Sequence, residues 1–124
     1  MEQTAVAAQV EGGLRVTELA EADRPRWDAF VADCPEATFF HRVGWKDVIE
    51  GVFGHPTWYL QAEGPDGLEG ILPLARIKSR LFGDALFSLP FCVYGGIAAT
   101  TERAVPALDE AAVALAERLG VGHL

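Results

Sequence analysis

Cysteine is scarce in this sequence, which contains only Cys34 and Cys92. The two residues lie far apart, and neither belongs to a Cys-x-x-Cys pair or to a Cys/His pairing. This pattern predicts neither a zinc site nor a disulfide framework. We therefore expect both cysteines to be small buried hydrophobic residues in a protein of the reducing cytoplasm.

Basic residues are also few, with 10 Lys and Arg against 18 Asp and Glu and a net charge of −8. No run of Lys or Arg is present to follow a polyphosphate backbone, so the sequence disfavours nucleic acid as a partner. The first residues are acidic where a signal peptide requires a basic start. The longest uncharged run, residues 85–101, is shorter than the ~20 residues that cross a bilayer, so no transmembrane segment is predicted.

Hydrophobic residues, in contrast, make up 50% of the 124 residues, which is enough for one domain with a buried core. Residues 1–13 show little periodicity and end in Gly-Gly, so we expect a loose leader before a domain of residues 14–124. Residues 14–19 (LRVTEL) predict a first strand.

Two helices are expected to follow this strand. The first has Asp23 as its cap, an apolar face that begins at Trp27, and an end at Cys34, which precedes a proline. The second is predicted over residues 41–53, because apolar residues recur there at helical spacing before a left-handed stop at Gly54. These residues are Trp45, Val48, Ile49 and Val52.

Three strands come next. Residues 57–63 (TWYLQAE) and 68–79 (LEGILPLARIKS) predict a hairpin around a Gly-Pro-Asp-Gly turn, and residues 85–90 (ALFSLP) predict a third strand. Pro73 lacks an amide hydrogen, so its place within the second strand predicts a sheet edge or a bulge.

The last complete element is a helix that is predicted over residues 101–119 and stops at Gly120. Its predicted apolar face consists of Val105, Leu108, Ala112, Leu115 and Leu119. A strand of ~5–6 residues normally follows a helix that has crossed a sheet, yet only residues 121–124 remain. We interpret the sequence as the first part of a longer protein, and a short natural edge strand is the alternative.

Gly95 and Gly96 precede this helix and allow two interpretations. Helix N-terminal amides favour an anion, so the loop is a possible phosphate cradle, but glycines before a helix also form simple turns. No hydrolase triad is indicated, because Ser79 and Ser88 lack a Gly-x-Ser-x-Gly elbow. We expect His41, which follows two phenylalanines, to be a capping or packing residue rather than a base.

The predicted order, β-α-α-β-β-β-α-β with the last strand cut short, is a mixed α/β (α+β) arrangement. It resembles the first two-thirds of the acyl-CoA N-acyltransferase (GNAT) superfamily, a mixed sheet flanked by helices in which the corresponding glycine loop cradles the cofactor pyrophosphate. The usual motif of that superfamily is missing from this loop. The segment Arg80 to Ala85 matches it by letter, but an apolar strand follows rather than a helix, so we attribute the match to chance.

A closer resemblance covers about residues 14–124. The paired elements "FFH…GW" and "LP…YGG" are similar to the amino-terminal half of FemAB-related proteins, particularly those associated with exosortase and exopolysaccharide loci in Gram-negative bacteria. Members of that family carry two GNAT-like domains, so the resemblance implies a further carboxy-terminal domain as the partner of this one.

The resemblance implies transfer of an acyl or aminoacyl group to an amine in cell-envelope or exopolysaccharide biogenesis. The donor would be acyl-CoA or aminoacyl-tRNA, most of the transfer machinery would belong to the second domain, and this domain would bind the acceptor, a small molecule or an envelope precursor. No cofactor is implied for this segment. Family members carry a basic side chain near the tryptophan of the second helix, where this sequence has Arg42 and Lys46. The alternative is that both are solvated surface charges.

Three functions follow as hypotheses. The chain is part of a FemAB-like transferase whose substrate-binding residues are Arg42, Lys46, Tyr94, Gly95 and Gly96. It is, alternatively, a non-catalytic binding module of the same fold that recognises an envelope precursor or a partner domain. The third hypothesis is a small self-sufficient N-acetyltransferase that binds acetyl-CoA at Gly95 and Gly96.

Overall fold

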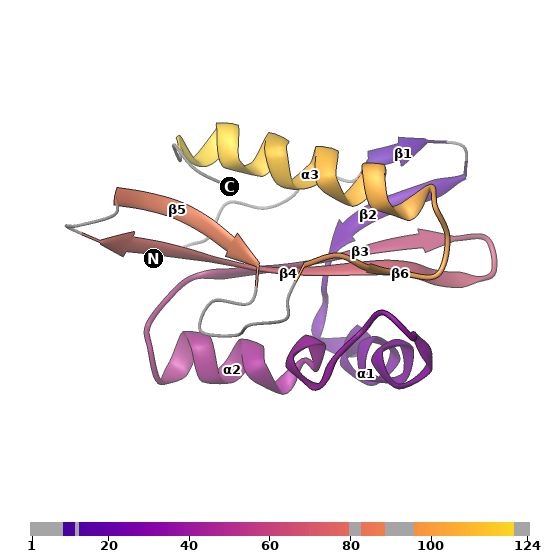
Figure 1. Ribbon diagram of the computed structural model, residues 1–124, viewed down its shortest axis with the longest axis horizontal. Coiled ribbons are helices and arrows are strands. Elements are labelled where there is room, and N and C mark those ends of the chain that lie inside the picture. Colours follow the sequence, from indigo (N-terminus) through magenta and orange to yellow (C-terminus); the bar gives the residue numbers. More distant parts are fainter. Residues whose placement is uncertain (1–8, 12, 80–82, 89–95, 121–124) are drawn as a thin grey trace.

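The computed structural model describes residues 9–11, 13–79, 83–88 and 96–120. It has a layer of sheet between two layers of helix, with α3 on one face and α1 and α2 on the other (Figure 1). The strands are β1 Gln9–Glu11, β2 Leu14–Glu18, β3 Thr57–Gly64, β4 Gly67–Ser79, β5 Gly83–Ser88 and β6 Ala98–Ala99. The helices are α1 Arg24–Asp33, α2 Gly44–Gly51 and α3 Ala104–Leu119, with short 3-10 turns η1 Glu21–Asp23 and η2 Phe39–His41.

The predicted combination of helices and strands, α+β, is confirmed over the described residues, in which two helices follow β2, strands β3 to β6 come next and α3 is the last element. The strands follow the order β1-β2-β3-β4-β5, and β6 pairs with β4. Every pairing among these strands is antiparallel, so the described sheet is not the mixed sheet that was predicted. A parallel pair requires a strand after a crossover helix, and the expected strand at residues 121–124 lies outside the described residues.

Strand β1 lies within the stretch that was predicted as a loose leader. It pairs with β2 in the register Gln9↔Val16 to Glu11↔Leu14. The connection between the two strands includes Gly13, whose φ of +82° is a conformation that glycine adopts without strain. The ordered domain therefore begins before residue 14.

Pro73 lies neither on an edge strand nor at a bulge, because β4 is paired on both sides and the register shift falls at Ala62/Glu63. Its partner across the sheet is Tyr59, whose carbonyl accepts a hydrogen bond from the Leu19 amide at 2.7 Å and so faces β2. Pro73 therefore belongs to a non-hydrogen-bonded pair, and its missing amide would point away from β3. On that side β6 ends its pairing at Ile71 and β5 begins at Leu74, so the proline removes no ladder bond.

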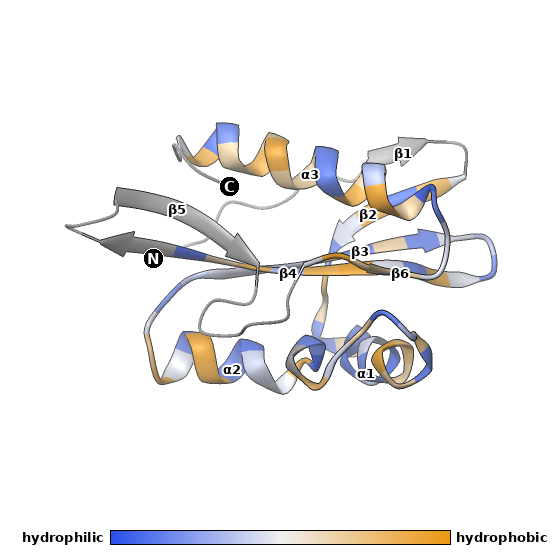
Figure 2. Cartoon of the chain, viewed as in Figure 1, coloured by the Kyte–Doolittle hydropathy of each residue, from blue (hydrophilic) through white to orange (hydrophobic). Residues whose placement is uncertain are grey.

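Both faces of the sheet are buried, and β3 supplies each of them by simple alternation. Trp58, Leu60 and Ala62 join the cluster under α3, whereas Tyr59 joins Trp27 and other residues under α1 and α2. Figure 2 shows the centre of the sheet as apolar. Cys34 is 4% exposed, as expected, and Cys92 lies outside the described residues.

The helix bounds differ from the prediction at the amino-terminal ends. Helix α2 begins at Gly44 after η2, and its apolar face is narrower than predicted, because Ile49 is buried but Val52 is 73% exposed. Helix α3 begins at Ala104 rather than residue 101, and it ends as predicted at Gly120, with φ +70°. Asp23 makes no cap hydrogen bond, because its carboxylate is bound by Arg26 and Gln61 instead.

Candidate functional site

The candidate site lies where the linker between α1 and α2, residues 34–43, meets residues 96–99, which we call the post-glycine segment. Nε2 of His41 lies 3.0 Å from the carbonyl oxygen of Gly96. This single contact brings together the two parts of the sequence that were predicted to bind substrate, since Arg42 is the next residue along the chain. The elements "FFH" and "YGG" that carry the family resemblance therefore meet at His41 and Gly96.

The surroundings of His41 determine its protonation state. The ring is buried, at 2% exposure, and the Thr38 amide donates to Nδ1 at 2.9 Å. A nitrogen that accepts a hydrogen bond carries no proton, so the ring is the neutral Nε2–H tautomer and donates to Gly96. Burial lowers the pKa of His41, and the Gly96 carbonyl opposes this shift without cancelling it. The prediction that His41 packs rather than acts as a base agrees with this geometry.

Other linker groups fix the same junction. The Trp27 indole donates to the His41 carbonyl at 2.7 Å, and Asp28 of α1 accepts from the Val43 amide at 2.8 Å. Glu36 accepts from the Ala99 amide at 2.9 Å, across the junction. The linker is thus attached to α1 on one side and to the post-glycine segment on the other.

The start of α3 does not have the arrangement expected for a phosphate cradle. The Ala99 amide is bound by Glu36, and the Thr100 amide donates to the Glu69 carbonyl at 2.8 Å. Strand β6 and a bend over residues 100–103 separate Gly96 from Ala104. The amides of Ala99 and Thr100, which lie between Gly96 and α3, are therefore already paired within the protein.

A carboxylate of the protein itself lies at the entry to α3. Glu69 of β4 accepts from Thr101 and from two nitrogens of Arg103, at 2.6–2.8 Å. These bonds, chiefly the one with the Arg103 guanidinium, lower the pKa of Glu69 to about 2. Residues 100–103 are therefore held to β4 by an internal anion, which sequence reasoning missed because Glu69 is more than 30 residues away along the chain.

The structure places the predicted substrate-binding residues differently. Arg42 is exposed and precedes α2, whereas Lys46 lies within α2 with its side chain only 14% exposed. The Lys46 ammonium contacts Glu50 at 2.5 Å and Thr57 at 3.0 Å, and it lies 5.9 Å from the centre of the Tyr59 ring. The alternative of a solvated surface charge therefore fits Arg42 and not Lys46. Tyr94 and Gly95 lie outside the described residues, and Gly96 has a φ of +103°.

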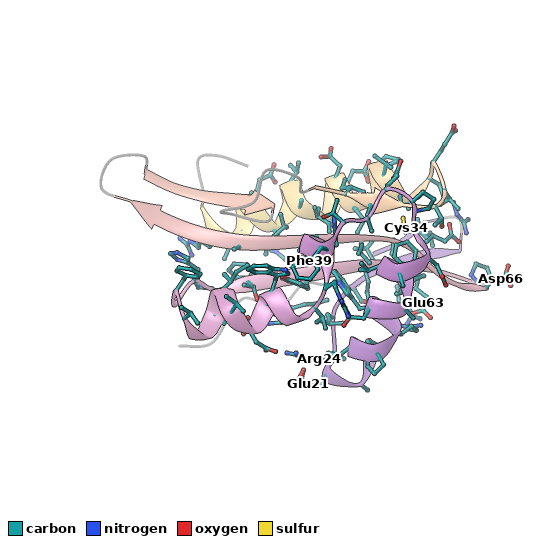
Figure 3. The ribbon with its side chains drawn as sticks, turned by 60° about the horizontal axis from the view of Figure 1, so that its bottom comes forward. Glu21, Arg24, Cys34, Phe39, Glu63 and Asp66 are labelled. Carbon is teal, nitrogen blue, oxygen red and sulfur yellow. The ribbon has the colours of Figure 1, made fainter. Side chains whose placement is uncertain are left out.

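The amino-terminal end of α2 also presents aromatic surface beside the junction. Phe39, which is 62% exposed (Figure 3), meets the ring of Trp45 edge-on, with centroids 6.0 Å apart. An exposed aromatic next to a cation suits contact with a ligand that has both apolar and anionic parts. Arg42 and Phe39 are therefore two exposed groups of the linker that this junction offers to a ligand.

A hollow lies away from this junction, near the tip of the hairpin of β3 and β4, where Figure 3 labels Asp66. It has a volume of about 250 Å³ and is lined by Gly13, Arg15, Glu63, Gly64 and Pro65. Glu63 is bound by Arg26, which lowers its pKa. Within the described ranges, no group of three or more His, Cys, Asp or Glu could hold a metal ion.

Comparison with known proteins does not assign this chain to a family, so a proposal for its function depends on the site. No protein-family model matches the chain, and no match was found among curated proteins or solved structures. Among the residues described, no helix has the length and apolar character needed to cross a membrane.

Proposed function

We propose that this chain is the acceptor-binding, amino-terminal portion of a FemAB-like acyl or aminoacyl transferase that acts on an amine in envelope or exopolysaccharide biogenesis in the cytoplasm. The observation that carries the proposal is the contact of His41 with Gly96. It joins the two segments of the family resemblance and leaves Arg42 exposed beside them. The acceptor class that suits Arg42 is an anionic envelope precursor, because a guanidinium binds phosphate and carboxylate through paired hydrogen bonds.

In the proposed reaction, the acceptor amine forms a bond to the carbonyl carbon of an ester or thioester donor. The carbon–oxygen or carbon–sulfur bond breaks, and a base receives the amine proton. Both nitrogens of His41 are committed to protein partners, so we assign it no proton transfer. We assign the base, and the amides that stabilise the oxyanion, to a second GNAT-like domain.

The alternative is a binding module that recognises such a precursor without transferring anything to it. Because Lys46 is paired with Glu50 and Thr57 and His41 is engaged, the described part of the junction offers Arg42 as its cation for binding, and this alternative needs no second domain beyond that. The two functions share acceptor binding and differ in catalysis.

Acceptor binding is tested by titrating uridine-diphosphate-linked muramyl pentapeptide into the 15N-labelled chain. We expect shift changes at the amides of residues 41–46 and 96–99, and an about tenfold weaker Kd for Arg42→Gln, because one charge-assisted hydrogen bond contributes about 1.5–3 kcal/mol. Arg118→Gln, a change on exposed α3, is the matched control and should leave the Kd unchanged. Equal affinities of the two variants, or shifts confined to other regions, would contradict the proposal.

Lys46 and catalysis are tested separately. We expect Lys46→Ala to leave the Kd unchanged and to lower the free energy of unfolding by about 1 kcal/mol, since it leaves Glu50 without its cation. A weaker Kd for Lys46→Ala would instead assign Lys46 to the acceptor. Amide formation by the full-length gene product, followed by mass spectrometry of the precursor, separates the transferase from the binding module.

A further inference from the structure

We propose that His41 is a positioning residue that holds the post-glycine segment to the linker, and that its protonation in mild acid releases this segment. Because this release would regulate acceptor binding, that part of the proposal rests on the function proposed above. The release itself depends only on the contacts of His41.

The neutral ring is what makes the contact possible. Nδ1 accepts from the Thr38 amide and lies 3.0 Å from the Thr38 hydroxyl, while Nε2–H donates to Gly96 at 3.0 Å. An imidazolium has a proton on both nitrogens. It would direct a second N–H toward the Thr38 amide, which is also a donor, so protonation is incompatible with the bond from this amide and requires the Thr38 hydroxyl to accept the new proton instead.

Burial adds to this incompatibility. The His41 ring is 2% exposed, and a buried cation without a carboxylate partner is costly. Titratable groups on the surrounding elements are Asp28 on α1, Glu36 in the linker, Arg42 beside the ring, Lys46 on α2 and Tyr59 on β3. Asp28 and Glu36 are engaged with the backbone amides of Val43 and Ala99, and Lys46 is engaged with Glu50. The neighbouring positions of β4 and β6, Ile71 and Ala98, are apolar.

The direction of the pH effect follows from linkage. The pKa of His41 is lowered from 6.5 in the closed arrangement, whereas an exposed ring in the released segment regains the ordinary value. The released form therefore binds more protons below about pH 6.5, and its population grows as the pH falls. If the closed ring stays largely neutral at pH 5, release becomes at least about tenfold more populated than at pH 7.5.

Release breaks a short chain of contacts. When the ring leaves Gly96, the bond from Ala99 to Glu36, the two-residue pairing with β4 and the packing of Ala98 and Ala99 in the core still hold the far end of the post-glycine segment. A two-residue strand depends on its neighbours to persist, so the loss of the His41 bond loosens the segment at its Gly96 end. Gly96 is then no longer held near Arg42. The proposed acceptor site, which lies between the linker and the post-glycine segment, loses the second of these two parts.

The test measures amide protection factors of Thr38, Ala99 and Thr100 at pH 7.5 and pH 5.0 by hydrogen exchange and NMR. The matched variant is His41→Gln, which keeps a donor and an acceptor but cannot titrate. We expect the protection factors to fall at least tenfold in the wild-type chain and to stay constant in His41→Gln. Glu36→Gln serves as a second control and should retain the pH effect, because His41 is still present.

A pH-independent wild type, or an equal pH effect in His41→Gln, would overturn the proposal. If His41→Gln does not fold, the ring 15N shifts of His41 in the wild-type chain replace it. The proposal is supported if the ring is the Nε2–H tautomer at pH 7.5 and if its protonation and the loss of amide protection have the same pH midpoint. Different pH midpoints for these two changes would refute the proposal. The muramyl precursor is titrated at both pH values. Release without precursor binding at either pH would leave the positioning role standing and reject the proposed function.

Discussion

Several polar side chains among the described residues bind backbone groups of other elements. Asp28 and Glu36 each accept from one amide, and His41 contacts both Thr38 and Gly96. The partners of Glu36 and His41 lie 63 and 55 residues away, so no local pattern could have revealed them. The residue types show which side chains are polar, but only the fold determined which of these side chains are hydrogen-bonded within the protein.

Glu69 gives a prediction about acid stability. Its pKa falls from 4.5 to about 2 in the folded chain, so its bonds stabilise the fold above about pH 4.5, and this contribution is lost as the pH falls toward 2. Glu69→Gln should therefore reduce the loss of stability between pH 5 and pH 2.5, measured as the urea midpoint at each pH. Glu110→Gln, on the exposed side of α3, is the control. An unchanged slope in Glu69→Gln would contradict the assigned pairing.

Gly70 gives a prediction about packing. A Cβ at this position would lie 2.9 Å from the Cβ of Ala104 and 3.0 Å from Leu108. The absence of a side chain lets α3 approach β4 closely, so Gly70→Ala should lower the free energy of unfolding by about 1–3 kcal/mol. Gly51→Ala meets nothing within 4 Å and should not destabilise. Urea unfolding of both variants tests this, and equal stabilities would show that the helix can move aside.

Among the elements, α3 shows how far periodicity can predict a packed face. Leu108, Ala112 and Leu115 are buried as expected, but Val105 is 42% exposed and Ala104 is fully buried in its place. The buried stripe is thus rotated toward the small residues of the helix. Close approach at Gly70 favours alanine at the contact, which a count of large apolar residues does not detect.

The same helix gives a paired prediction. Leu108→Ala removes a fully buried side chain between α3 and the sheet and should cost about 2–5 kcal/mol. Val105→Ala lies three residues earlier, at the exposed rim, and should cost less than about 1 kcal/mol. Thermal and urea unfolding measure both. Similar losses in the two variants would mean that α3 is rotated relative to the structure described above.

Helices α1 and α2 are joined by charge as well as by apolar packing. Arg24 binds both carboxylate oxygens of Asp47 at 2.8 and 2.9 Å and also contacts Glu21 beside it (Figure 3). The guanidinium lowers the pKa of Asp47. Such pairs at the surface contribute little. The position of α2 is therefore set mainly by Ile49 and by the Lys46–Glu50–Thr57 group.

The whole molecule places its polar junction on the face of the sheet that carries α1 and α2, and the start of α3 on the other face (Figure 1). Strands β5 and β6 pair with the same side of β4, β6 at Gly70 and Ile71 and β5 from Leu74 onward. The post-glycine segment thus returns to the sheet before α3 begins. This arrangement separates Gly96 from the helix N-terminus that the sequence seemed to place next to it.

That separation gives a prediction about acetyl-CoA. We expect no binding heat when acetyl-CoA is titrated to millimolar concentration into this chain, because the amides of Ala99 and Thr100 are paired and the Glu69 carboxylate already binds Thr101 and Arg103 at the start of α3. Isothermal titration calorimetry measures this, with the muramyl precursor as the comparison ligand. Saturable heat at one site per chain would instead support the self-sufficient acetyltransferase.

The hairpin of β3 and β4, the first strand and the three helices could be predicted because each is encoded by neighbouring residues: periodic apolar positions, prolines and terminal glycines. Two errors have a common cause. Asp23 was expected as a cap and Pro73 as an edge residue, because each rule considers one element at a time. In the structure Gln61 of β3 contributes to binding Asp23, and the spacing of β5 and β6 accommodates Pro73.

The sequence by itself determined the α/β class, the succession of elements and the burial of most apolar positions, since these depend on interactions within a few residues. Only the tertiary structure decided that His41 meets Gly96, that Lys46 turns inward and that Glu69 lies at the start of α3. Those outcomes depend on which distant polar groups the packing of apolar faces brings within hydrogen-bonding distance. A buried polar group must find such a partner or incur the cost of desolvation, so packing of the two faces of the sheet determined where the candidate site lies.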